Sequence, residues 1–170
     1  EPASIQVVTG SSVADAGSSL AVRVEVRDRL GNLLSDVPVS ATLLLAPVPL
    51  PGNSPADVTL SATATGGAGP DLPATVTAST RAGANLVRFC VAAPAFPGIC
   101  VTITVTGVVG PPVRLALATQ YAAVAPGGTA QIRATVLDQY GNIVPAPSAT
   151  LMAFSIDPPG GGTVGAAAPG

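Results

Sequence analysis

A pentapeptide of the form Asp-x-x-Gly-Asn occurs twice in this 170-residue chain, at Asp28–Asn32 and at Asp138–Asn142, an offset of 110 residues (138 − 28). The likeness extends around the motif, because residues 4–43 align without a gap on residues 114–153. A repeat of this length corresponds to one small domain, so the chain is predicted to contain a tandem array. The repeat indicates the architecture, but it does not say what the protein contacts.

Apolar and polar residues alternate with a period of two, which is typical of β-strands with one buried face. Residues 20–26 show this pattern and residues 130–136 repeat it, while 19 glycines and 18 prolines punctuate the chain. No segment shows a helical period, and strands about ten residues apart predict an all-β sandwich. The further strands expected in the first copy are 4–9, 37–45, 58–65, 74–79, 86–92 and 99–106.

The repeat predicts three parts: a complete sandwich at 1–109, a short proline-rich linker at 110–112, and the first half of a second domain at 113–170. The second copy offers only its first three strands, ending near Ile156. Half a sandwich leaves an apolar sheet face in water. We therefore expect β-strands from another chain, or sequence beyond Gly170, to complete it. In the first case the protein would polymerise head to tail, because strand addition is a heterologous contact.

The extended motif Val-x-Asp-x-x-Gly-Asn, at 26–32 and 136–142, resembles the signature of bacterial immunoglobulin-like repeats of the invasin and intimin type. Residues 80–84 resemble the start of a later strand in that family. The resemblance implies an immunoglobulin-like β-sandwich repeated in tandem, with the second copy incomplete. Such repeats are usually stiff spacers in cell-surface adhesins and, less often, accessory modules of secreted enzymes. The proline-rich segment 46–56, the cysteine pair and the missing half domain depart from the family pattern.

The aspartate that opens each copy of the motif has two interpretations, as an acid or metal ligand and as a structural turn residue. An aspartate at the start of a turn accepts backbone N–H bonds, and a following glycine supplies positive φ. No second carboxylate recurs nearby, so a calcium cage of oxygens is not indicated. We therefore interpret the motif as structural. Its residues are Asp28, Gly31, Asn32, Asp138, Gly141 and Asn142.

Cys90 and Cys100 are the two cysteines of the chain. Alternation turns Phe89 inward and Cys90 outward, and it turns Cys100 outward on the partner strand, so both sulfurs are predicted on the wet face of one hairpin. Residues opposed in a sheet lie within disulfide range. We therefore predict a Cys90–Cys100 disulfide, with two reduced thiols as the alternative and a metal site as a remote one. An oxidised pair indicates an extracytoplasmic location.

Composition excludes several classes of function. The chain has no His and no Lys, charged residues make up 9%, and the formal net charge is −2. A basic surface for nucleic acid is therefore missing, and so is the usual general base and metal ligand. No apolar stretch reaches the length of a membrane helix. We predict no catalytic, cofactor-binding or metal-binding residues.

The sequence thus favours a non-enzymatic, extracellular or cell-surface module of a structural or adhesive, filament-forming protein. Its expected partners are copies of itself or neighbouring immunoglobulin-like domains. Two alternatives stay open. One is a carbohydrate- or surface-binding accessory domain of a secreted enzyme, against which the 3% aromatic content argues. The other is a phage or appendage decoration protein of the same fold.

Overall fold

The computed structural model describes residues 1–9, 11–66, 71–119, 123 and 125–145. This part of the chain contains no helix that is long and apolar enough to cross a membrane. Its strands are β1 (Ser4–Thr9), β2 (Val13–Asp15), β3 (Ser19–Arg27), β4 (Val39–Leu45), β5 (Asp57–Leu60), β6 (Asp71–Thr77), β7 (Gly83–Val91), β8 (Cys100–Val108), β9 (Arg114–Thr119) and β10 (Ile132–Leu137).

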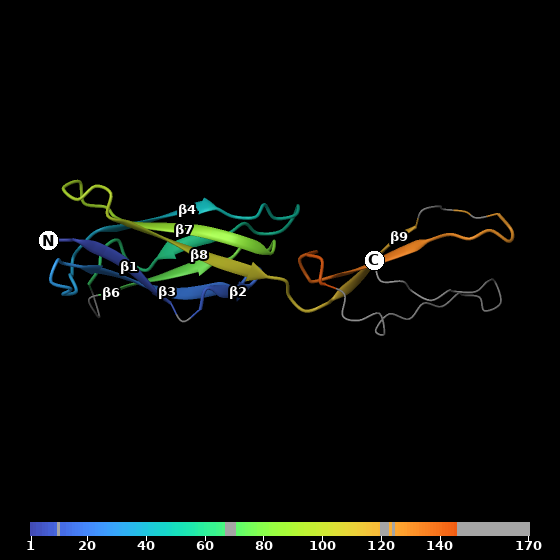
Figure 1. Cartoon of the computed structure of the whole chain (residues 1–170), viewed down its shortest axis with the longest axis horizontal. Coiled ribbons are helices and arrows are strands. Elements are labelled where there is room, and N and C mark those ends of the chain that lie inside the picture. The colour runs from blue at the N-terminus through green and yellow to red at the C-terminus, as the bar shows by residue number, and fades with distance from the viewer. Residues whose placement is uncertain (10, 67–70, 120–122, 124, 146–170) are drawn as a thin grey trace.

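Strands β1 to β8 form two four-stranded sheets that face each other (Figure 1). The first sheet has the order β1-β3-β6-β5 and the second has the order β2-β8-β7-β4. All of these pairs are antiparallel except β2 with β8, which is parallel. Antiparallel sheets in this strand order define the immunoglobulin sandwich. The predicted all-β, immunoglobulin-like fold is confirmed for residues 4–108, which we call the first unit.

The alternating apolar residues meet between the two sheets, as their period of two requires. Burying a side chain such as Val, Leu or Phe contributes about 1.5–3 kcal/mol, so this layer is the main source of stability for the first unit. The most deeply buried apolar side chains are Val24, Val26, Leu72, Val76, Val87, Phe89 and Val105.

One predicted strand, 58–65, is wrong in its second half. Strand β5 ends at Leu60, and the chain then crosses to the segment ahead of β4, where the N–H of Thr65 donates to the carbonyl of Val37. The buried Thr65 hydroxyl donates to the carbonyl of Leu34 and accepts from the N–H of Val37. Residues 61–65 therefore join the two sheets, because their backbone bonds the segment that leads into β4, as when the N–H of Val39 donates to the carbonyl of Thr63, instead of extending β5.

Two further differences from the predicted strands concern β2, which was not predicted, and β6, which begins earlier than predicted. Strand β2 is only three residues long, too short for a pattern, and pairs with β8. Strand β6 begins at Asp71 and includes Pro73, although proline cannot donate to a ladder. Pro73 lies just beyond the last paired residue of β5, and its carbonyl still accepts a hydrogen bond from the N–H of Ser61 at 3.0 Å. Pro73 has no N–H to return this bond, and the pairing with β5 ends there.

The second unit, described at residues 113–119, 123 and 125–145, is there a two-stranded sheet of β9 and β10. Its register copies that of the first unit, since Leu115 opposes Val136 as Ile5 opposes Val26. The third strand predicted for this unit lies outside the described residues. The apolar face of β9 and β10 is exposed, with exposed fractions of 47% for Leu115, 60% for Leu117 and 55% for Ile132.

Candidate functional site

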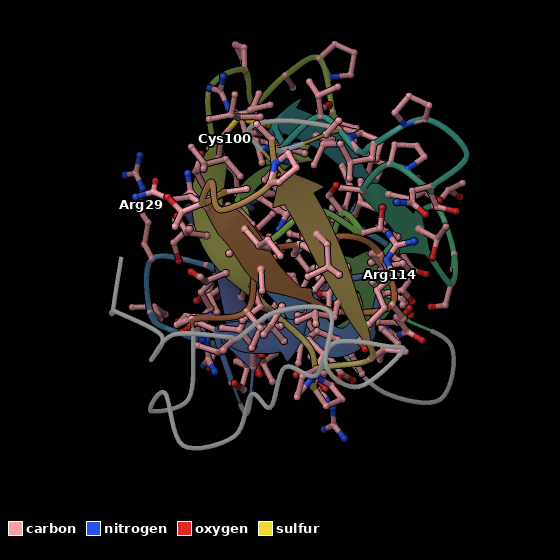
Figure 2. The ribbon with its side chains drawn as sticks, turned by 90° about the vertical axis from the view of Figure 1, so that its right-hand side faces the viewer. Arg29, Cys100 and Arg114 are labelled. Carbon is pink, nitrogen blue, oxygen red and sulfur yellow. A yellow bond between two sulfur atoms is a disulfide. The ribbon has the colours of Figure 1, made fainter. Side chains whose placement is uncertain are left out.

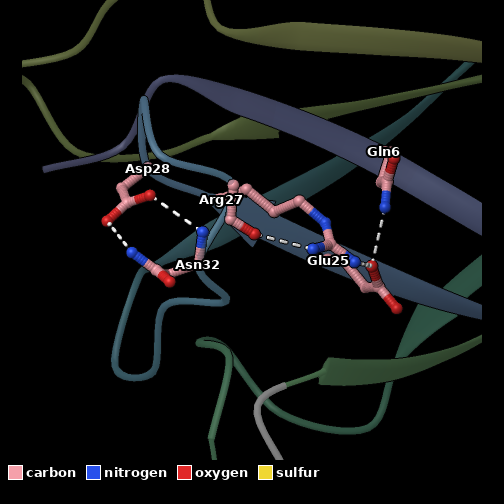
Figure 3. Close-up of polar contacts among 6 residues, drawn as sticks. Gln6, Glu25, Arg27, Asp28 and Asn32 are labelled. Carbon is pink, nitrogen blue, oxygen red and sulfur yellow. Dashed lines mark hydrogen bonds and ion pairs between the residues drawn. The ribbon is translucent and has the colours of Figure 1, made fainter.

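The first Asp-x-x-Gly-Asn motif, residues 28–32, forms a tight turn directly after β3, which we call the first turn (Figure 3). Asp28 Oδ1 accepts hydrogen bonds from the N–H groups of Leu30, at 2.8 Å, and Asn32, at 2.9 Å. Its Oδ2 accepts from Asn32 Nδ2, at 2.9 Å. Gly31 has a φ of 84°, which glycine adopts without steric cost. The carboxylate thus organises the backbone of the turn.

The second motif, residues 138–142, forms the same turn after β10, which we call the second turn. Asp138 Oδ1 accepts from the N–H groups of Tyr140 and Asn142, both at 2.9 Å. Its Oδ2 accepts from Asn142 Nδ2 at 2.8 Å, and Gly141 has a φ of 85°. The repeated sequence therefore produces a repeated hydrogen-bond geometry.

The second turn also bonds the end of the first unit through the amide of Asn142. Asn142 Nδ2 donates to the carbonyl of Thr80 at 2.8 Å, and Asn142 Oδ1 accepts from the N–H of Ala82 at 3.1 Å. A side-chain amide has the same donor and acceptor as a peptide group, so it can pair with a carbonyl and an N–H two residues apart. The first and second units are therefore in direct contact at this place, which we call the junction.

Tyr140 adds two contacts to the junction. Its carbonyl accepts a hydrogen bond from Asn53 Nδ2 at 2.8 Å. Its phenol ring lies over Gly17, so closely that a Cβ on Gly17 would stand 2.7 Å from the Tyr140 hydroxyl oxygen. Gly17 also has a φ of 76°. Both its conformation and this close approach require glycine.

The linker and the second turn are joined by Asp138, whose side chain is fully buried. Its Oδ2 accepts a hydrogen bond from the N–H of Gly110 at 3.1 Å. Gly141 faces Leu50 and Arg114, because a Cβ on Gly141 would lie 3.0 Å from Leu50 Cδ1 and 3.1 Å from Arg114 Nη2. The junction is thus built from the first unit, the linker and the second turn together.

The proline-rich segment 46–56 supports the surface that receives the second turn. Ser79 Oγ donates to the carbonyl of Pro47 at 2.8 Å, and Thr80 Oγ1 donates to the carbonyl of Ser54 at 2.8 Å. The N–H of Thr80 also donates to Ser54, at 3.2 Å. In the sequence, this segment stands out only as a departure from the family pattern. The partners are mostly backbone groups, so residue types gave no signal for this role.

The first turn is braced differently, by a side chain of its own unit (Figure 3). Arg27 Nη1 donates to the carbonyl of Gly31, and its Nη2 pairs with Glu25 Oε2, both at 2.7 Å. Gln6 Nε2 donates to the same carboxylate oxygen at 2.7 Å. The second copy has Leu137 at the position of Arg27, so it lacks this brace.

Hydrogen bonds lower the pKa of both aspartates and burial raises it, but burial weighs more at Asp138 than at Asp28. The hydrogen bonds from the side chain and backbone of Asn32 lower the pKa of Asp28. For Asp138, burial raises the pKa, but the hydrogen bonds to its carboxylate outweigh burial and the pKa is lowered. The donors to Asp138 are Asn142, Gly110 and Tyr140.

The predicted disulfide is confirmed, since Cys90 and Cys100 are bonded and directly paired between β7 and β8. Both cysteines are half-buried rather than on the wet face that was predicted, and on β7 the flanking β4 places Ser40 opposite Cys90. The hairpin loop after β7 and the first turn lie at the end of the first unit farther from the second unit (Figure 1). The disulfide is therefore remote from the junction.

The other charged residues form no further cluster within the described part of the chain. Arg29 extends outward from the first turn (Figure 2). Among the described residues, no three Cys, Asp or Glu side chains gather as a metal site would require.

Comparison with known proteins gives one similar structure. No protein-family model matches the chain, and no curated protein matches it. The chain is similar to a solved structure of FdeC, an adhesin of Escherichia coli, with 23% identity and a TM-score of 0.49. The match covers 81% of this chain and 41% of that one, so it spans less than half the length of the solved chain. The immunoglobulin-like assignment rests on the strand order of the two sheets and not on this likeness.

Proposed function

We propose that this chain is a non-enzymatic structural segment of an extracellular or cell-surface protein. In this proposal it contains tandem immunoglobulin-like domains, at 1–109 and from residue 113, joined by the linker 110–112. Their role is to hold a fixed relative orientation, so that the protein keeps some other part at a distance. The observation that carries this proposal is the pairing of Asn142 with Thr80 and Ala82 across the junction.

The proposed stiffness has a physical source in the junction. Three hydrogen bonds join the second turn to the first unit, from Asn53 to Tyr140, from Ala82 to Asn142, and from Asn142 to Thr80. A hydrogen bond contributes about 0.5–1.5 kcal/mol net, so three give on the order of 3 kcal/mol. That favours the docked arrangement about a hundredfold. The adjacent Pro111 and Pro112 stiffen the linker further.

An extracellular location is supported by the disulfide, since disulfides persist in oxidising compartments and are rare in the cytosol. The chain also has few aromatic residues, 3% in all, with which a sugar-binding surface is usually built. The low aromatic content favours a surface spacer over an accessory domain for polysaccharide.

Spin labels on the two units test this function. Thr59 in β5 and Arg133 in β10 are exposed, so labelled Thr59→Cys and Arg133→Cys report the distance between the units by pulsed electron paramagnetic resonance. We expect a narrow distance distribution that Asn142→Ala broadens and the matched Asn32→Ala leaves unchanged. A broad distribution in the otherwise unaltered chain would refute a fixed orientation.

A second part of the proposal concerns the exposed face of β9 and β10. Ile5 and Val22 in the first unit have exposed fractions of 8% and 2%, whereas their counterparts Leu115 and Ile132 have 47% and 55%. We propose that strands from another chain, or from sequence beyond Gly170, complete the second unit, and that completion in trans produces head-to-tail polymers.

Sedimentation velocity over a range of protein concentrations tests polymerisation. Growth of the sedimentation coefficient with concentration, suppressed by Leu117→Lys, is the result expected for completion in trans. A monodisperse monomer in which residues 114–137 are fully protected from hydrogen exchange would rule out the need for any added strand.

A further inference from the structure

The first turn presents outward the groups that the second turn uses in the junction. Asn32 is exposed, whereas Asn142 is half-buried against the first unit. Leu30 occupies the position of Tyr140 and is 87% exposed. Within the described residues, the Asn32 amide bonds only Asp28, so its capacity to pair with a carbonyl and an N–H of another backbone is unused.

The chain enters both units along the same path. The N–H of Ala3 donates to the carbonyl of Arg27 at 2.8 Å, and the N–H of Val113 donates to the carbonyl of Leu137 at 2.9 Å. A unit attached ahead of Ala3 by a linker such as 110–112 would therefore arrive beside the first turn. This is how the first unit arrives beside the second turn.

We propose that the first turn is a docking surface for the end of another immunoglobulin-like unit, one that precedes it in the same chain. Asn32 would pair with a backbone carbonyl and an N–H that lie two residues apart, as Thr80 and Ala82 do. Leu30 would cover the glycine that corresponds to Gly17. A second copy of the first unit carries all of these groups.

The brace from Arg27 gives this turn a property that suits docking. Because Arg27 Nη1 holds the carbonyl of Gly31, the turn keeps its conformation without help from a partner. A surface that needs no ordering loses less conformational entropy on binding. The second copy has Leu137 in place of Arg27 and so lacks this brace, but there the first unit and the linker hold the turn in its conformation.

This inference rests on the proposed function, since it extends one fixed junction to a series of them. The test is a fusion protein in which residues 1–112 are followed directly by residues 3–170. The leading copy retains a complete core, because the buried core side chains lie between Ile5 and Val105. In the fusion, we expect Asn32 of the trailing copy to pair with Thr80 and Ala82 of the leading copy.

Spin labels at Thr59→Cys of the leading copy and Thr59→Cys of the trailing copy span the new junction. We expect a narrow distance distribution that Asn32→Ala of the trailing copy broadens at least twofold, with Asn142→Ala as the control that leaves it unchanged. A distribution that is broad, or that is narrow and insensitive to Asn32→Ala, would overturn the inference.

The failure of this inference is distinguishable from that of the proposed function. Labels at Thr59→Cys and Arg133→Cys of the trailing copy span the native junction in the same fusion. A narrow distance distribution across the native junction together with a broad one across the new junction refutes only the docking role of the first turn. Broad distributions across both junctions refute the docking role and the proposed function. The unfused chain could instead dimerise, with Asn32→Ala abolishing the dimer, while the fusion gives a broad distance distribution across its new junction. That result would overturn the assignment of the docking partner to a unit in the same chain.

Discussion

The first and second turns have one sequence pattern and one hydrogen-bond geometry, yet they differ in what surrounds them. Asp138 is fully buried and also bonds the linker, whereas Asp28 is half-buried and bonds only its own turn. Asn142 pairs with another unit, and Asn32 faces solvent. The local sequence therefore specifies the turn, and its position relative to a neighbouring unit determines what the turn does.

The largest expected effect is on the stability of the sandwich, and it tests whether this stability is independent of the order at the junction. Replacing Cys90 and Cys100 with serine removes a crosslink with a sequence separation of 10. Loop-closure entropy predicts a loss of about 3 kcal/mol in the free energy of unfolding, measured by urea denaturation. Because the disulfide is remote from the junction, hydrogen exchange at Ala82 under native conditions should not change. Faster exchange at Ala82 would show that the two are coupled.

The next effect contrasts the two aspartates directly. Asp138→Ala leaves the N–H groups of Gly110, Tyr140 and Asn142 without their acceptor, so it should cost roughly 1–3 kcal/mol and accelerate exchange at Ala82. Asp28→Ala is the matched control. It should disorder the first turn locally and leave the exchange of Ala82 as it is. Equal effects of the two variants on Ala82 would contradict the difference between the turns.

A smaller effect comes from a pair of glycines that share a conformation. Gly17 and Gly127 have φ values of 76° and 79°, so alanine at either position costs about 1–2 kcal/mol of backbone strain. Only at Gly17 would the added Cβ meet Tyr140, while nothing lies within 4 Å of a Cβ at Gly127. Gly17→Ala should broaden the distance distribution between spin labels on the two units, and Gly127→Ala should not.

The smallest effect is the pH dependence of the junction. The pKa of Asp138 is lowered in the folded protein, so the ionised carboxylate stabilises the fold fully above its unfolded pKa of about 3.9. That stability is lost as the pH falls through the lowered native pKa. Order at the junction should be constant from pH 7 to about 4.5 and should decline below about 4. Asp138→Asn should remove this decline and Asp28→Asn should retain it, as measured by spin-label distances.

Much of the first unit follows from local pattern. The strands at 4–9 and around 20–26 were predicted because their alternation is regular, and the disulfide was predicted because Cys90 and Cys100 are centred on one hairpin. Residues 61–65 were wrongly predicted to continue a strand, and strand β2 was missed, because the pairing of both depends on distant segments and not on periodicity. Most of these contacts use backbone groups, which every residue carries.

The junction could not be predicted from the sequence either, because it too depends largely on backbone groups. Thr80 and Ala82 contribute a carbonyl and an N–H, and their side chains give no indication of a partner. The proline-rich segment 46–56 stands out in the sequence as a departure from the family pattern, but its support of Thr80 depends on the carbonyl of Ser54. The sequence did contain one signal of the junction, which is that the two otherwise similar motifs differ at two positions. The first copy has Leu30 and Arg27 where the second has Tyr140 and Leu137.

The most direct test of the fixed junction is the measurement of residual dipolar couplings in a weakly aligned sample of the whole chain. Couplings from β1 to β8 and couplings from β9 and β10 each define an alignment tensor for their own unit. If the second turn holds the units together, both sets fit one tensor with the same magnitude and orientation. Two tensors of different magnitude would mean that the units move independently, and that the second turn is no more a junction than the first.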